Sequence, residues 1–119
     1  MKMAAPFTAI SYLTQYFDYA DTTFTIGSLP PNALVVDSGA WVITAFNGSA
    51  PVLDLGTSTD TDGFATDLAV GSKGLKKADE LATSDDLVVG ATPVTVKGVL
   101  AGDSSTAGEG VAFVAYIVR

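Results

Sequence analysis

Turn-forming residues divide this chain into short segments along nearly its whole length. The 119 residues include 12 glycines and 5 prolines, and the runs between them are rich in Val, Ile, Thr, Phe and Tyr. Short runs of this kind, separated by turn residues about every ten positions, are typical of an all-β sandwich or barrel. The predicted strands are Ser11–Asp18, Thr22–Gly27, Ala33–Asp37, Trp41–Phe46, Val52–Leu55, Leu87–Val89, Val94–Leu100 and Val111–Val118.

The predicted fold class is therefore all-β: a single-domain antiparallel β-sandwich or jelly-roll with an N-terminal arm. The chain is long enough for one hydrophobic core and no more. We divide it into residues 1–20, an N-terminal arm or first strand, and residues 21–119, the β-sandwich domain. One segment departs from the β pattern, because apolar residues recur at helical spacing over Lys73–Ala82 and predict a short helix or turn there.

The last predicted strand is apolar on both faces. One face carries Val111, Phe113, Ala115 and Ile117, and the other carries Ala112, Val114, Tyr116 and Val118. A strand of a lone sandwich buries one face and exposes the other to water, and a domain of this size has no third layer. Either an N-terminal arm of the same chain covers the second face, or another subunit does. We favour a second subunit, because large apolar patches are rarely left in water.

Aromatic residues are concentrated near the N-terminus, where the first 24 residues hold six of the eleven. Aromatic side chains are enriched in the cores of protein interfaces. The segment is thus either an ordinary first strand that supplies the core or an arm that docks on a neighbour. The predicted interface residues are Phe7, Tyr12, Tyr16, Phe17, Val114 and Tyr116.

The composition argues against an enzyme and against a nucleic-acid-binding protein. There is no Cys and no His, which removes thiolate chemistry, the commonest general base and the commonest metal ligand. Six basic against thirteen acidic residues give a net charge of −7, the opposite of the cationic surface that binds nucleic acid. No run is long enough to span a membrane, and we see no signal peptide. We therefore expect no catalytic residues, cofactor, nucleic-acid partner or membrane.

Acidic residues are the remaining candidates for chemistry. The segment from Ser58 to Gly63 partly matches the start of an EF-hand calcium loop through Asp60 and Asp62, but Ala69 stands where that loop needs a bidentate glutamate. We interpret it as a solvated surface loop, with a calcium site as the alternative. The pairs Asp79-Glu80 and Asp85-Asp86 are interpreted as surface charge rather than glycosidase carboxylates. The cluster of Lys73, Lys76 and Lys77 is either a solvated turn or a docking contact.

Several short motifs occur in an order that resembles small structural proteins of tailed bacteriophages. They cover roughly Thr22 to the C-terminus and are, in order, Ile26–Val36, Trp41–Gly48, Leu53–Thr57, Asp60–Phe64 and Ala107–Tyr116. The resemblance implies a capsid cement (decoration) protein, a homo-oligomer and specifically a trimer. It also implies synthesis in the host cytoplasm and binding to the major capsid protein on the capsid surface of the virion. The alternative is a tail or fibre module that binds a receptor or sugar, for which Tyr19 with Asp18 and Asp21 is the candidate site.

Overall fold

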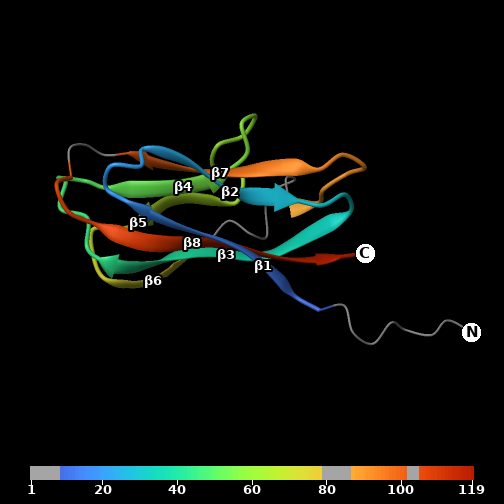
Figure 1. Cartoon of the computed structure of the whole chain (residues 1–119), viewed down its shortest axis with the longest axis horizontal. Coiled ribbons are helices and arrows are strands. Elements are labelled where there is room, and N and C mark those ends of the chain that lie inside the picture. The colour runs from blue at the N-terminus through green and yellow to red at the C-terminus, as the bar shows by residue number, and fades with distance from the viewer. Residues whose placement is uncertain (1–8, 79–86, 102–104) are drawn as a thin grey trace, which may run out of the picture.

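The computed structural model shows two facing four-stranded sheets (Figure 1). It describes residues 9–78, 87–101 and 105–119. The strands are β1 (Ser11–Asp18), β2 (Thr23–Leu29), β3 (Ala33–Thr44), β4 (Val52–Gly56), β5 (Ala65–Ala69), β6 (Gly74–Lys77), β7 (Val94–Ala101) and β8 (Glu109–Val118). All strand pairs are antiparallel, and the predicted all-β sandwich is confirmed.

The connections pass back and forth between the two sheets. Sheet A has the order β1-β8-β3-β6, and sheet B has the order β2-β7-β4-β5. Every pair of consecutive strands except β4 and β5 is divided between the sheets. As a result, β8 lies between β1 and β3 although it comes last of the strands in sequence (Figure 1).

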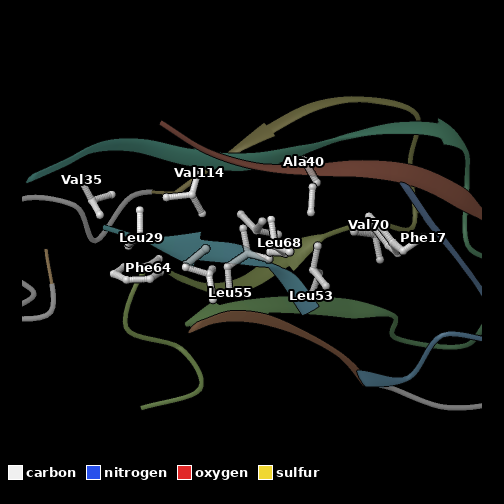
Figure 2. Close-up of a cluster of buried hydrophobic side chains, with 14 of the residues drawn as sticks. Phe17, Leu29, Val35, Ala40, Leu53, Leu55, Phe64, Leu68, Val70 and Val114 are labelled. Atoms are coloured by element: carbon white, nitrogen blue, oxygen red, sulfur yellow. The ribbon is translucent and has the colours of Figure 1, made fainter. Parts of the chain in front are cut away.

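The core fills the space between the sheets. Figure 2 shows Ala40 and Val114 pointing from sheet A toward Leu53 and Leu55 of sheet B. At one end, the ring of Phe17 stacks on Phe24 at 4.7 Å and on Phe46 at 5.5 Å between ring centroids. The fully buried large side chains are Phe17, Phe46, Phe64, Leu29, Leu53, Leu55, Val70, Val96 and Val114. Their burial on folding is the main favourable contribution to stability.

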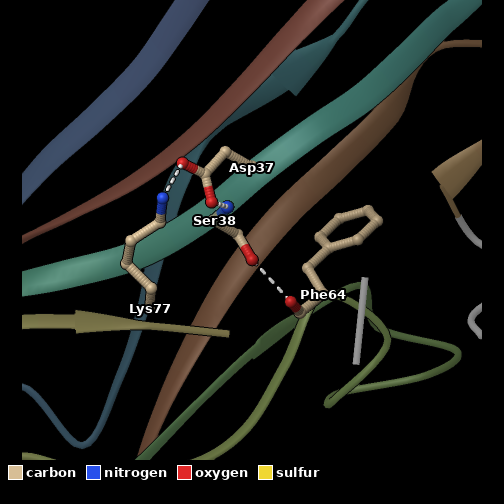
Figure 3. Close-up of polar contacts among 4 residues, drawn as sticks. All are labelled: Asp37, Ser38, Phe64 and Lys77. Carbon is tan, nitrogen blue, oxygen red and sulfur yellow. Dashed lines mark hydrogen bonds and ion pairs between the residues drawn. The ribbon is translucent and has the colours of Figure 1, made fainter. Parts of the chain in front are cut away.

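Strand β3 is one continuous strand of twelve residues, where the sequence predicts two strands with a break between them. Ser38, in the expected break, is fully buried, and its hydroxyl donates to the Phe64 carbonyl oxygen at 2.5 Å (Figure 3). Gly39 is in extended pairing with β6, and a Cβ there would collide with the carbonyl oxygen of Lys76. The Ser-Gly-Ala sequence therefore marks a close approach of two strands and not a turn.

Two strands, β5 and β6, are missing from the sequence-based prediction. The helix predicted at Lys73–Ala82 is wrong over its described part, because Gly74–Lys77 pairs with β3 as strand β6. The left-handed φ of Gly74 (123°) turns the chain into β6, which is incompatible with a helix starting there. Residues 79–82 lie outside the described residues. The predicted strand at Leu87–Val89 is reduced to one isolated bridge between Val88 and Leu34.

Residues 11–18 belong to the sandwich. Strand β1 pairs with β8 in unbroken register from Ser11 opposite Tyr116 to Asp18 opposite Glu109. This pairing places residues 11–18, which the sequence assigns to an N-terminal arm or first strand, in sheet A. Residues 1–8, including Phe7, lie outside the described residues.

Candidate interaction surface

The outer face of sheet A carries a row of large side chains that crosses all four strands. Tyr16 on β1 lies opposite Val111 on β8, Val111 lies opposite Trp41 on β3, and Trp41 lies opposite Leu75 on β6. Residues directly opposite in a sheet point to the same face, so these side chains form one continuous band. Tyr16 and Trp41 are each 50% exposed and Leu75 is 46% exposed, although a folded chain ordinarily buries such side chains.

Phe113 of β8 lies beside this band and is covered by rings from its neighbours. The Phe113 ring centroid is 5.2 Å from that of Trp41 and 6.4 Å from that of Tyr12, and Phe113 is only 3% exposed. The outward face of the last strand is therefore covered by side chains of its own chain. The covering rings are themselves exposed, with Tyr12 at 60%. We call the surface formed by Tyr12, Tyr16, Trp41, Leu75 and Phe113 the aromatic face.

The outer face of sheet B has a different chemistry. Thr23 lies opposite Val99 and Val99 opposite Asp54, while Thr25 lies opposite Lys97. Hydroxyl and charged groups thus dominate a face that water can solvate well. The two outer faces of the sandwich are unequal, and only the aromatic face resembles the core of a protein interface in composition.

The structure places the predicted interface residues that it describes in three different environments. Tyr12 and Tyr16 lie exposed on the aromatic face. Phe17 and Val114 have no exposed surface and lie inside the sandwich, so they are corrected to core residues. Tyr116 is half-buried and packs against the core. The physical reason is that β1 directs Phe17 and β8 directs its even-numbered side chains into the space between the sheets. The sequence pattern of β8 did not show which of its two apolar faces lies inside.

Sequence reasoning missed Trp41 and Leu75 as interface candidates. The alternation of Trp41 with Val42 and Ile43 places the tryptophan and the isoleucine on one face of a strand, and 47% of Ile43 is exposed. Leu75 gave no strand signal, because it lies in the four-residue β6. The aromatic face becomes visible only when the register between β3 and β6 is known.

A carboxylate holds one edge of the aromatic face in place. Glu109 accepts hydrogen bonds from the Tyr16 hydroxyl at 2.7 Å and from the Thr44 hydroxyl at 3.0 Å. The hydrogen bond to Glu109 raises the pKa of Tyr16, with smaller contributions from desolvation and from the negative charges of Glu109, Asp18 and Asp21. The neutral tyrosine is therefore favoured, and its hydroxyl remains a donor at neutral pH.

Removing the charge at Glu109 is expected to lower the pKa of Tyr16 toward the ordinary tyrosine value. Glu109→Gln weakens the hydrogen bond that the neutral hydroxyl donates and removes the nearest negative charge. Spectrophotometric titration of tyrosinate absorbance, compared between the wild-type protein and the variant, measures the change. Because the pKa is raised in the folded state, the stabilising contact is complete below the ordinary tyrosine pKa and is lost as pH rises through the folded value. An unchanged titration curve would contradict this assignment.

The acidic loop that resembles part of an EF-hand is a turn held by its own main chain. The Asp60 carbonyl oxygen accepts from the Thr57 and Gly63 amides at 2.8 Å and 3.2 Å. Nearby, the Asp54 side chain accepts from the Asp67 amide at 2.7 Å. Partial burial is the main cause that raises the pKa of Asp54, and the charges of Asp67 and Asp62 add to it. Within residues 9–78, 87–101 and 105–119, no three acidic side chains gather in a way that could hold a metal ion.

Two lysines of the predicted cluster make polar contacts at the surface. Lys77 pairs with Asp37 at 2.9 Å across β6 and β3 (Figure 3), and Lys76 donates to the Ser72 hydroxyl at 2.8 Å. The pairs Asp79-Glu80 and Asp85-Asp86 lie outside the described residues. In the part of the chain that is described, no helix is long and apolar enough to cross a membrane.

Two solved capsid structures contain chains with this fold. A chain of the cyanophage Pam1 capsid asymmetric unit superposes with a TM-score of 0.68 at 20% identity, over 100% of this chain and 94% of that chain. A chain of the acidic stable capsid structure of Helicobacter pylori bacteriophage KHP30 superposes with a TM-score of 0.59 at 16% identity, over 92% and 87%. No protein-family model and no curated protein sequence matches the chain. The similarity at these identities is one of fold, shared by chains of about the same size.

Proposed function

We propose that this chain is a non-enzymatic structural protein of a bacteriophage virion. More narrowly, we propose a capsid cement (decoration) protein that binds the outer surface of the phage head. There it stabilises contacts between major capsid protein subunits. The observation that carries the proposal is the aromatic face, combined with a fold that this chain shares over its full length with a chain in the Pam1 capsid asymmetric unit.

The inequality of the two outer faces suggests how the protein sits on a head. The aromatic face of sheet A contacts protein, and the Thr-rich face of sheet B contacts solvent. A four-stranded sheet about eight residues long covers roughly 19 Å by 26 Å, or about 500 Å² in outline. A standard stable contact needs about 800 Å² of accessible surface on each partner. The outline of sheet A thus amounts to somewhat more than half of such a contact.

The strand order supports the narrower description of the fold as a jelly-roll. Eight antiparallel strands in two sheets, with nearly every connection passing between the sheets, match the double Greek-key arrangement found in viral capsid domains. The sequence resemblance implies that the protein assembles as a trimer over junctions in the shell. Sedimentation velocity of the isolated protein measures that oligomeric state.

The direct test uses phage heads that lack this protein. Purified protein is added to such heads, and the bound fraction is measured by co-sedimentation and by cryo-electron microscopy. We expect saturable binding of many copies on the shell lattice, and greater resistance of the loaded heads to heat-induced loss of DNA. Failure to bind intact heads would reject the cement function.

A tail or fibre module is the second candidate, because one hollow has features of a sugar site. Tyr16, Tyr19, Asp18 and Glu109 line a shallow hollow of about 260 Å³. Asp21, the third residue of the predicted site, accepts a hydrogen bond from the Asp18 amide at 3.0 Å. Exposed aromatic rings beside carboxylates suit sugar recognition. A few copies located at the tail of the virion, with none on the shell, would favour this candidate.

A further inference from the structure

Strand β1 is an edge strand that lacks the protective features of the other edges. Sheet A ends in β1 and β6, and sheet B ends in β2 and β5. The register of β2 is broken by a bulge between Thr25 and Gly27, β5 contains Asp67 with a left-handed φ of 52°, and β6 has only four residues, two of them lysines. Bulges, short length and lysines are common ways to block unwanted strand pairing. In contrast, β1 has eight residues in unbroken register and contains no proline, lysine or arginine.

The main-chain groups that β1 presents at its open edge follow from its register with β8. The Tyr19 amide donates to the Gly108 carbonyl at 3.1 Å, which continues the hydrogen-bond ladder between β1 and β8. In an antiparallel pair such bonds recur at every second residue, so the odd-numbered residues of β1 direct their main-chain groups toward β8. The even-numbered residues therefore direct their N–H and C=O groups outward. Two of these outward groups are already bonded within the chain. The Tyr16 carbonyl oxygen accepts from the Gln15 side-chain amide at 3.0 Å, and the Asp18 main-chain amide donates to the Asp21 carboxylate. Among the residues that the structure describes, none bonds to the outward main-chain groups of Tyr12 and Thr14.

The charge around this edge indicates which partner it suits. Residues 9–21 carry Asp18 and Asp21 and no basic residue, and Glu109 lies opposite Asp18 on β8. A second copy of the chain carries the same net charge of −7 and is repelled at long range. A basic segment is attracted instead. Its outward side chains would lie beside Tyr12 and Tyr16 and would extend the aromatic face by one strand.

We propose that β1 accepts an extended, basic segment of the capsid shell protein as a fifth strand of sheet A. Main-chain hydrogen bonds to Tyr12 and Thr14 supply affinity in this kind of recognition, and contacts with alternate side chains supply specificity. The inference rests on the proposed cement function. It adds that β1 binds the shell and that the partner segment is an extended, basic strand.

Replacing Thr14 with proline tests the inference. Thr14→Pro removes an outward N–H and places a ring at the open edge, while the hydrogen bonds between β1 and β8 stay intact. We expect the variant to bind heads that lack this protein at least tenfold more weakly than the wild-type protein. The matched control is Thr25→Pro, which makes the same exchange on the edge of β2, and it is expected to bind like the wild type. Equal binding by Thr14→Pro and the wild type would overturn the inference and leave the cement function standing.

Amide hydrogen exchange gives an independent measurement on the unaltered protein. We expect exchange in the peptide that contains β1 to slow at least tenfold when the protein is bound to heads. Unchanged exchange on protein-loaded heads overturns the inference, even if Thr14→Pro fails to fold. If exchange in the β1 peptide instead slowed with rising protein concentration in the absence of heads, a second copy of the chain would be the partner of β1. That result would also overturn the inference. If the wild-type protein binds no heads, the cement function and this inference fail together.

Discussion

Replacing Val114 with aspartate is expected to destabilise the folded protein severely. Val114 has no exposed surface and points into the core between the sheets (Figure 2). Among the residues that the structure describes, the buried core around Val114 contains no basic side chain, and an uncompensated buried charge costs about 3–5 kcal/mol. That is a large part of the roughly 5–15 kcal/mol by which a typical domain is stable. Urea unfolding followed by circular dichroism measures the loss.

The matched control lies on the same strand. Val118→Asp introduces the same side chain at a position that is 44% exposed, and we expect a change in unfolding free energy below about 1 kcal/mol. If Val114→Asp kept the stability of the wild-type protein and changed only its oligomeric state, Val114 would face a partner and its assignment to the core would be wrong.

Replacing Trp41 with alanine is expected to weaken binding to phage heads about 30-fold. Trp41 lies centrally on the aromatic face, between Val111 and Leu75, and half of its surface is exposed. Tryptophans in such positions often contribute 2 kcal/mol or more to binding, which corresponds to the expected factor. Co-sedimentation with heads that lack this protein, over a range of protein concentrations, measures the affinity.

Two comparisons make this result specific to the aromatic face. Val88→Ala removes an apolar side chain that is 56% exposed but lies outside the aromatic face, and it is expected to bind like the wild type. The thermal unfolding midpoint of Trp41→Ala shows whether the fold is retained, since the ring also packs on Phe113. Normal head binding by a folded Trp41→Ala protein would exclude the aromatic face as the contact surface.

Local patterns in the sequence predict the strands of this fold well where they are long and apolar. The range predicted for β1 agrees with the structure at both ends, and β7 and β8 differ from their predictions by one or two residues at their ends. These strands have β-branched and aromatic runs bounded by turn residues, which are local features. The same rules divided β3, because Ser38 and Gly39 have the composition of a turn but are required by contacts with Phe64 and Lys76.

The interaction surface could be predicted only in part, for a reason that concerns β8. The side chains on both faces of β8 are apolar. The sequence therefore shows that both faces must be shielded from water, but it does not show which face packs between the two sheets. The structure assigns Val114 to the core and Phe113 to the outside, beneath Trp41 and Tyr12. That choice depends on how sheet B packs, which is determined by residues distant in sequence.

The place of β8 in the middle of sheet A has a consequence for biosynthesis. Neither β1 nor β3 can complete its pairing until β8 has emerged from the ribosome, and the contact between Tyr16 and Glu109 spans 93 positions. Folds dominated by such distant pairings form in milliseconds to seconds. During translation β1 and β2 therefore remain without their sheet partners, and their open edges are exposed to pairing with other chains until β7 and β8 have been made.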